Sequence, residues 1–137
     1  MALTHLVDTS VLTRVAYPPV RSALEPLVAA GAAARAGISD LEVGFCARND
    51  KEWEQLIGAL QLLPLVETSA AHVARARQTQ RLLSAKRQRG RKVPDLLIAA
   101  AAEEQGLTLL HYDADFDLIA KVTGQSCHWI VTKGSID

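Results

Sequence analysis

Cysteine is scarce in this chain, and the two thiols that it has exclude several classes of protein. Cys46 and Cys127 form no CxxC pair and have no histidine at metal-ligand spacing, so a zinc site is not indicated. Two cysteines in 137 residues are also too few for the disulfide framework of a small secreted domain. We therefore expect a reducing compartment, the cytoplasm.

Long hydrophobic runs are also missing. The longest uninterrupted apolar stretch, Leu96 to Ala102, spans seven residues, whereas crossing a bilayer takes roughly 20. The first residues, MALTHLVDTSVL, lack the basic start and the long apolar run of a secretory signal, and Asp8 interrupts the run that exists. We expect a protein without a membrane span that is not exported.

A net charge is absent too, because 15 basic residues balance 15 acidic ones. What the chain has in quantity is apolar residues, at 49%. This content suffices for one hydrophobic core at this length without disulfides or structural metal. Internal repeats, low-complexity tracts and an evident linker are lacking, so residues 1–137 are expected to form a single domain.

Short apolar segments alternate with segments of helical spacing along the whole chain. Strands are expected at residues 3–7, 36–38, 62–66, 107–111 and 129–131. Helices are expected directly after Asp8, over 20–34, from Ser39 or Asp40, from Asn49, from Thr68 or Ser69 to about 87, over 94–102 and over 116–122. This alternation predicts a three-layer α/β/α domain, in which helices cover both faces of a central, mostly parallel sheet.

Several single positions carry expectations of their own. Thr9 or Ser10 is expected to cap the first helix, and Glu42 is expected in the first turn of the helix that begins near Ser39. Further expectations are a buried Trp53, an inward-facing Val73 and a helix end at Gly90.

Five acidic residues stand where strands end or helices begin: Asp8, Glu42, Asp95, Asp113 and Asp115. Asp8 and Asp113 follow strands, Glu42 and Asp95 fall near the starts of helices on the same sheet edge, and Asp115 can reach the same rim. Close carboxylates repel one another unless a cation or shared protons neutralise them, so the pattern predicts a pocket for divalent metal. Taken singly, Asp8, Asp95 and Asp115 are also explained as acids that satisfy free N–H groups at helix starts.

The chemistry of such a pocket follows from its ligands. Oxygen-only ligation selects hard cations, Mg2+ or Mn2+. With these ions the natural reaction is hydrolysis of a phosphodiester bond. We expect Asp8, Asp95, Asp113 and Asp115 to hold the metal directly or through water, and Glu42 to be a further ligand or to orient the nucleophile.

Two other functions of the same acids are not supported, because the residues that they require are replaced. The run from Asp113 to Asp117 resembles the start of a calcium loop, but Leu118 and Gly124 stand where an EF-hand needs glycine and glutamate. Asp117 is instead expected to interact with the helix dipole. The start Asp8-Thr9-Ser10 resembles phosphatases that form an aspartyl phosphate, but Ser10 replaces their second acid.

Acidic residues are missing from residues 72–94, where the basic residues concentrate. Eight of the 15 Lys and Arg residues lie there: Arg75, Arg77, Arg81, Lys86, Arg87, Arg89, Arg91 and Lys92. A one-sign run leading into Asp95 favours contact with a nucleic-acid backbone beside the metal. Because no aromatic residue is near for base stacking, the shape of a folded RNA is the expected feature recognised. A solvated helix face, or contact with an acidic partner protein, is the alternative.

Four motifs resemble the PIN domain, specifically the VapC toxins. They are VDTSVL at 7–12, SDLE at 39–42, PDLLIAAAA at 94–102 and HYDADFDLIA at 111–120. With TGQ at 123–125 the resemblance covers nearly the whole chain, and four motifs in this order and spacing are specific. The resemblance implies a PIN-like fold and an endoribonuclease that depends on Mg2+ or Mn2+. It also implies the toxin half of a type II toxin–antitoxin pair, held inactive by a VapB-type antitoxin.

The resemblance assigns roles to the acids. Asp8, Glu42, Asp95 and Asp113 match the acidic quartet of the family, and Asp115 matches a frequent additional acid. A homodimer, and an antitoxin tail that places a basic side chain in the acidic cleft, are likewise implied. The expected substrate is a structured RNA such as tRNA or rRNA. The competing hypothesis is a non-catalytic PIN-like module that binds RNA or an acidic partner through the basic run.

Overall fold

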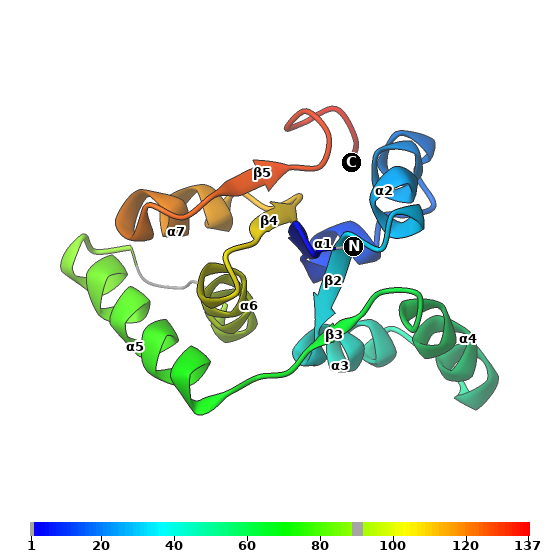
Figure 1. The fold of residues 1–137 in the computed structure, drawn as a ribbon, viewed down its shortest axis with the longest axis horizontal. Coiled ribbons are helices and arrows are strands. Elements are labelled where there is room, and N and C mark those ends of the chain that lie inside the picture. Colours follow the sequence, from blue (N-terminus) through cyan, green and yellow to red (C-terminus); the bar gives the residue numbers. More distant parts are fainter. Residues whose placement is uncertain (1, 89–91) are drawn as a thin grey trace.

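Five short parallel strands form the centre of the molecule (Figure 1). The computed structural model describes residues 2–88 and 92–137. The strands are β1 (His5–Val7), β2 (Ala33–Ala36), β3 (Leu65–Val66), β4 (Thr108–His111) and β5 (Cys127–Trp129). Their order in the sheet is β3-β2-β1-β4-β5, and each neighbouring pair is parallel. The short β3, with Pro64 directly before it, lies at an edge as expected.

Helices cover both faces of this sheet, which confirms the predicted three-layer α/β/α fold (Figure 1). One layer holds α5 (Ala70–Ala85), α6 (Val93–Glu104) and α7 (Asp115–Thr123). The other holds α1 (Thr9–Leu12), α2 (Pro18–Ala29), α3 (Gly37–Phe45) and α4 (Asp50–Leu60). Successive side chains of a strand point to opposite faces, so Leu6 packs into the first layer and Val7 into the second. No helix within the described residues has the length and hydropathy needed to cross a membrane.

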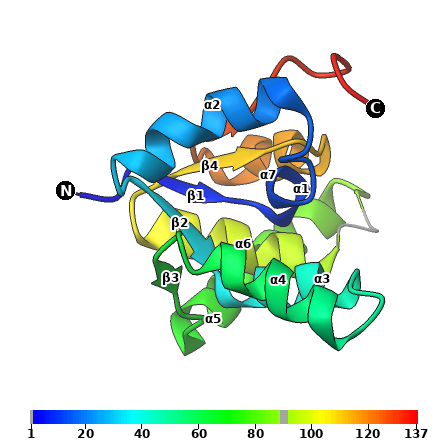
Figure 2. The same ribbon diagram turned by 90° about the vertical axis from the view of Figure 1, so that its right-hand side faces the viewer.

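The α6 helix runs through the middle of its layer. Its apolar body, Leu96 to Ala102, is almost entirely buried, as its lack of a polar face predicted. Pro94 lies in the first turn, where its missing N–H costs nothing. Figure 2 shows that α6 begins near the edge where β1 and β4 end. Asp95 follows Pro94 in this first turn.

Several elements have boundaries that differ from the expected ones, and three of the differences are largest or have a clear cause. The second strand occupies Ala33–Ala36 rather than 36–38, and the last occupies Cys127–Trp129 rather than 129–131. The helix expected to reach residue 34 ends at Ala29, because Gly31 adopts a positive φ of 67° that stops it. Small residues suit β2, since all four of its residues are buried and three of them are alanine; the fourth, Arg35, is paired with Asp40.

Helix starts also differ from expectation. Asp8 itself caps α1, because its Oδ2 accepts a hydrogen bond from the Ser10 N–H at 2.9 Å; Thr9 and Ser10 do not cap it. The chain passes from β2 directly into α3, which begins at Gly37. Glu42 therefore lies in the second turn of α3 and not in the first.

Two expected burial positions are wrong. Trp53 is 42% exposed and Val73 is 46% exposed, whereas His72 is buried on α5 instead. The buried face of α5 consists of His72, Ala76, Thr79 and Leu83, and Val73 lies beside this face. The inward-facing His72 forms a capping box with Ser69. The α5 helix ends at Ala85, and Gly90 lies outside the described residues.

Gln125 connects two helices of the first layer. It follows α7, which ends at Gly124 with a φ of 75°, and its side-chain Nε2 donates to the Ala99 carbonyl of α6 at 2.9 Å. We expect Gln125→Ala to lower the free energy of unfolding by about 1 kcal/mol, because a partly buried hydrogen bond is lost. Urea denaturation measures this, and Gln80→Ala on the exposed side of α5 is the control. Equal stabilities of the two variants would contradict the assignment.

Candidate metal centre

A cleft of about 560 Å3 opens at the carboxyl edge of the sheet. Asp8, Glu42, Asp95 and Asp113 line it. Asp8 directly follows β1, and Asp113 follows β4 after Tyr112. Because β1 and β4 are neighbouring parallel strands, the chain leaves both at the same edge. The structure thus brings together four acids that are up to 105 residues apart in sequence.

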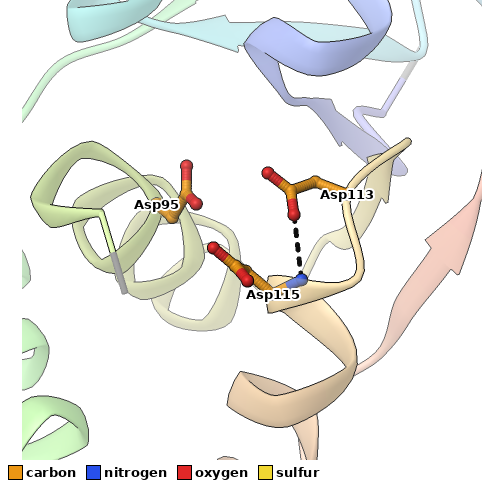
Figure 3. A group of neighbouring side chains, drawn as sticks. All are labelled: Asp95, Asp113 and Asp115. Carbon is orange, nitrogen blue, oxygen red and sulfur yellow. Dashed lines mark hydrogen bonds between the residues drawn. The ribbon is translucent and has the colours of Figure 1, made fainter. Parts of the chain in front are cut away.

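Three carboxylates form a tight group within the described residues. One oxygen each from Asp95, Asp113 and Asp115 lies within 4.8 Å of the others. Figure 3 shows them pointing toward one another from α6, from the loop after β4 and from the start of α7. Asp113 Oδ1 also accepts a hydrogen bond from the Asp115 N–H at 2.9 Å, which fixes the loop between them. Carboxylates this close together favour a bound cation.

Among the described residues, two buried carboxylate oxygens lack hydrogen-bond partners, one within this group and one in a neighbouring acid of the cleft. Asp8 is 2% exposed and Asp95 is 4% exposed. Asp8 Oδ1 and Asp95 Oδ2 have no hydrogen-bond partner among the described residues. Leaving a charged oxygen buried and unpaired is costly, so both atoms need a cation or a proton. These residues therefore fit a hard metal ion that takes oxygen ligands.

The electrostatics of the acids agree with this need. Burial raises the pKa of Asp8 to about 6, and the charge of Glu42 adds to the effect. Burial followed by the charge of Asp8 raises the pKa of Asp95 to about 7. Burial would also raise the pKa of Asp113, but hydrogen bonds from the Asp115 N–H and the Lys92 ammonium outweigh it and lower that pKa. Of these three aspartates, Asp113 stays ionised most readily.

Glu42 lines the cleft but lies outside the three-acid group. The Thr9 hydroxyl lies 2.7 Å from Glu42 Oε1 and 2.8 Å from the hydroxyl of the fully buried Ser39. This contact joins the start of α1 to α3 and holds the carboxylate in place. Sequence reasoning missed Thr9 and Ser39 as site residues, although each belongs to a motif that carries an acid.

His111 and Asp117 make contacts next to the acid group but are not part of it. His111 is fully buried, lies 5.1 Å from the Phe116 ring and 4.9 Å from the Trp129 ring, and accepts at Nδ1 from the Asp113 N–H. Burial lowers the pKa of His111 to about 4, so it is neutral at pH 7. Asp117 accepts from the Trp129 indole N–H at 3.1 Å and is absent from the acid group.

The basic run divides between several places. Arg75 binds Glu103 on α6 at 2.6 Å, and Lys92 reaches into the cleft to bind Asp113 Oδ2 at 3.0 Å. Arg77 and Arg81 line a shallow groove on α5. Lys86 and Arg87 follow the end of α5, whereas Arg89 and Arg91 lie outside the described residues. The structure therefore leaves part of the run facing solvent and ties Arg75 to α6.

Known proteins identify the fold and the family. The family model of the PIN domain matches residues 5–122, a span that contains all five acids. The chain is 62% identical to ribonuclease VapC51 of Mycobacterium tuberculosis over 137 residues, the whole of both proteins. The chain belongs to the VapC family of PIN-domain ribonucleases. The predicted family is thereby confirmed.

Two further relatives extend this result. Ribonuclease VapC21 of M. tuberculosis is 41% identical to this VapC-family chain, over 98% of the chain and 99% of the relative. The crystal structure of DNA-bound VapBC from Salmonella typhimurium has a chain with a TM-score of 0.75 and 15% identity, covering 94% of this chain and 99% of that one. The second comparison shows that the VapC fold is shared at low sequence identity.

Proposed function

We propose that this VapC-family chain is the toxin of a type II toxin–antitoxin pair and an endoribonuclease that uses Mg2+ or Mn2+ to hydrolyse a structured RNA, tRNA or rRNA. The whole chain, residues 1–137, acts as one domain in the cytoplasm and forms a homodimer. The observation that carries the proposal is that Asp95 Oδ2, in the three-acid group, and the nearby Asp8 Oδ1 are buried and have no hydrogen-bond partner among the described residues.

Each residue has a role in this reaction. Asp95, Asp113 and Asp115 would hold the metal, and Asp8 Oδ1 is available as a further ligand. An ion bound there would supply an activated water and stabilise charge on the leaving oxygen. Glu42, fixed by Thr9, orients the attacking water by accepting a hydrogen bond from it. Lys92, at the rim, offers a positive charge to the RNA backbone.

The solvent-facing part of the basic run would bind the RNA backbone at a distance from the metal site. Arg77, Arg81, Lys86 and Arg87 lie on α5 and just after it, and the chain then leads back to the cleft at Lys92. Phosphate contacts of this kind carry affinity but little sequence information, so the fold of the RNA would select the substrate. Arg89 and Arg91 remain proposed RNA-binding residues from the sequence alone, because they lie outside the described residues. Arg75 is paired with Glu103, so it would support this RNA-binding track by joining α5 to α6 rather than by binding phosphate as a free cation.

A VapB-type antitoxin is the proposed inhibitor, since several solved structures with this fold are VapBC complexes. An apolar groove of about 560 Å3 separates α2 from α4 and offers a surface for it. Leu12, Leu24, Leu56 and Leu63 line the groove, and Arg21 and Glu25 also line it. An amphipathic antitoxin helix fits such a groove, and a basic side chain after it would neutralise the acids of the cleft.

Purified protein incubated with total RNA tests the proposal. We expect cuts at a few positions in Mg2+ or Mn2+, found by mapping new 5′ ends, and no cuts in EDTA. Cleavage that persists in EDTA would overturn the metal-dependent mechanism. Tight, salt-sensitive RNA binding without any metal-dependent cut would instead favour a non-catalytic binding module.

A further inference from the structure

The cleft contains a basic residue that the motifs do not include. Arg14 lies two residues after α1 and lines the same cleft as Asp8 and Asp113. It belongs neither to the basic run nor to the acid group. Its side chain is 26% exposed, so it is partly sheltered yet reachable from solvent. A guanidinium in this place needs an explanation of its own.

The guanidinium of Arg14 is held in a fixed orientation. Its Nη1 donates to the Ser10 carbonyl at 2.8 Å, and its central carbon lies 5.1 Å from the centre of the Tyr112 ring. The remaining edge, Nε and Nη2, faces the Asp137 carboxylate at 3.2 and 3.1 Å. The Ser10 carbonyl and the Tyr112 ring thus orient the guanidinium so that Nε and Nη2 form a two-donor fork, and the Asp137 carboxylate binds both donors. A rigid two-donor fork of this kind matches a carboxylate or a phosphate equally well.

The segment that carries Asp137 is itself fastened to the cleft. The Tyr112 hydroxyl accepts from the Gly134 and Ile136 N–H groups at 3.0 and 3.2 Å and donates to the Ile136 carbonyl at 2.6 Å. Ile136 also packs against the core on the α2 side. Figure 1 shows this last segment, in red, curling back toward α2. Tyr112 directly precedes Asp113, so one residue ties the segment to the metal acids.

The Arg14–Asp137 pair is well suited to exchange. Asp137 is 40% exposed, and ion pairs this open to water contribute little to stability. A phosphodiester oxygen pair could therefore replace the Asp137 carboxylate on the same two donors. Lys133, which also lines the cleft, lies 5.6 Å from the Trp129 ring and adds a second positive charge to this wall. The acids and these two cations together give the cleft a metal side and a phosphate side.

We propose that Arg14 is a positioning residue that binds a backbone phosphate of the RNA substrate, and that Asp137 is an internal stand-in which this phosphate displaces. The inference rests on the proposed ribonuclease function and names how that site binds its substrate. It predicts opposite effects from removing the two partners. Loss of Arg14 weakens RNA binding, and loss of the Asp137 charge strengthens it. A merely structural ion pair would make both changes harmful or neutral.

Binding is measured with a fluorescein-labelled RNA hairpin in an Asp8→Asn background, in which the RNA stays intact. We expect Arg14→Gln to weaken binding about tenfold and to lower the slope of log affinity against log salt by about one, as for one lost phosphate contact. Arg14→Lys should restore the slope but only part of the affinity, because lysine lacks the two-donor fork. Asp137→Asn should tighten binding about threefold, and it should have no effect once Arg14 is glutamine.

Matched controls remove charges outside the cleft. Arg48→Gln removes a cation whose side chain is 85% exposed, and Glu25→Gln removes an exposed acid of α2. With Asp8 restored, Arg14→Gln should raise KM for RNA about tenfold and change kcat less than twofold, because the contact exists in both the ground and transition states. A melting temperature within the range of the controls separates binding from stability.

The outcomes distinguish the inference from the function on which it rests. If Asp137→Asn weakens binding, or if Arg14→Gln affects binding no more than Arg48→Gln, the phosphate site is wrong even though RNA is cut. If the opposite binding effects appear but no metal-dependent cut is found, the phosphate site stands and the ribonuclease function fails.

Discussion

Asp95→Asn is expected to abolish RNA cleavage and, at the same time, to make the metal-free protein more stable at pH 8. Asp95 is 4% exposed, and burial together with the charge of Asp8 raises its pKa to about 7. At pH 8 the folded protein must therefore carry a buried carboxylate that opposes folding. Asparagine has a similar shape and no charge, so we expect a gain on the order of 2 kcal/mol in the free energy of unfolding.

The loss of activity has a separate cause. Asp95 contributes one of the three oxygens in the acid group, and an amide is a weaker ligand for a hard cation than a carboxylate. We expect kcat to fall by about 1,000-fold, the scale of losing a central electrostatic contact in an active site. Initial rates with Mn2+ and thermal unfolding in EDTA measure the two effects on the same preparations.

Asp50→Asn is the matched control, because Asp50 is exposed at the start of α4 and outside the cleft. It should leave kcat unchanged and should not stabilise the protein. If metal-free Asp95→Asn melted below the wild type at pH 8, the buried charge would not be the dominant destabilising feature of the cleft.

Metal ions are expected to stabilise the protein far more at pH 8 than at pH 5. The pKa values of Asp8 and Asp95 are about 6 and about 7 in the folded protein, against 3.8 for an ordinary aspartate. Between pH 4 and 7 the folded state therefore binds more protons than the unfolded state. Raising the pH through this window removes those protons and destabilises the metal-free fold.

A cation reverses this penalty because it binds the deprotonated carboxylates. We expect 5 mM Mn2+ to raise the melting temperature by about 5 °C or more at pH 8 and by less than about 2 °C at pH 5, on the usual scale of a few kcal/mol. Scanning fluorimetry at both pH values measures the shifts. The Asp95→Asn variant should lose the larger part of the pH dependence, because the pKa of Asp95 is raised further than that of Asp8. Equal metal shifts at the two pH values would contradict the protonation argument.

Sequence patterns placed the acids well because strand ends and helix starts are simple geometric signals. Asp8 and Asp113 follow β1 and β4, and Asp95 lies in a first turn beside Pro94, so the edge of the sheet brings them together. The apolar run from Leu96 to Ala102 likewise predicted a buried helix. These features depend on local chain geometry and on hydrophobic burial, both of which are visible in a short window of sequence.

Other features depend on contacts across the chain and could not be predicted in this way. The alanine-rich β2 lacks the branched residues typical of strands, and it forms because its small side chains fit between two helical layers. Val73 was expected to face inward, but the first buried residue of α5 is His72, which forms a capping box with Ser69. Arg14 and Asp137 are 123 positions apart in the sequence, so no local sequence pattern predicts their contact.

The neighbouring strands β1 and β4 also determine how the metal site can be lost. Val7 pairs with Leu110, and the Asp8 N–H donates to the Leu110 carbonyl at 2.9 Å, so hydrogen bonds of the sheet extend up to the acid itself. The separation of Asp8 from the segment that carries Asp113 is thus a strand spacing, about 4.8 Å. Loops can fray one at a time, whereas the two central strands of a sheet separate only when the domain unfolds. Amide hydrogen exchange at Asp8 should therefore report the stability of the whole protein, and metal affinity should disappear in a single step with global unfolding.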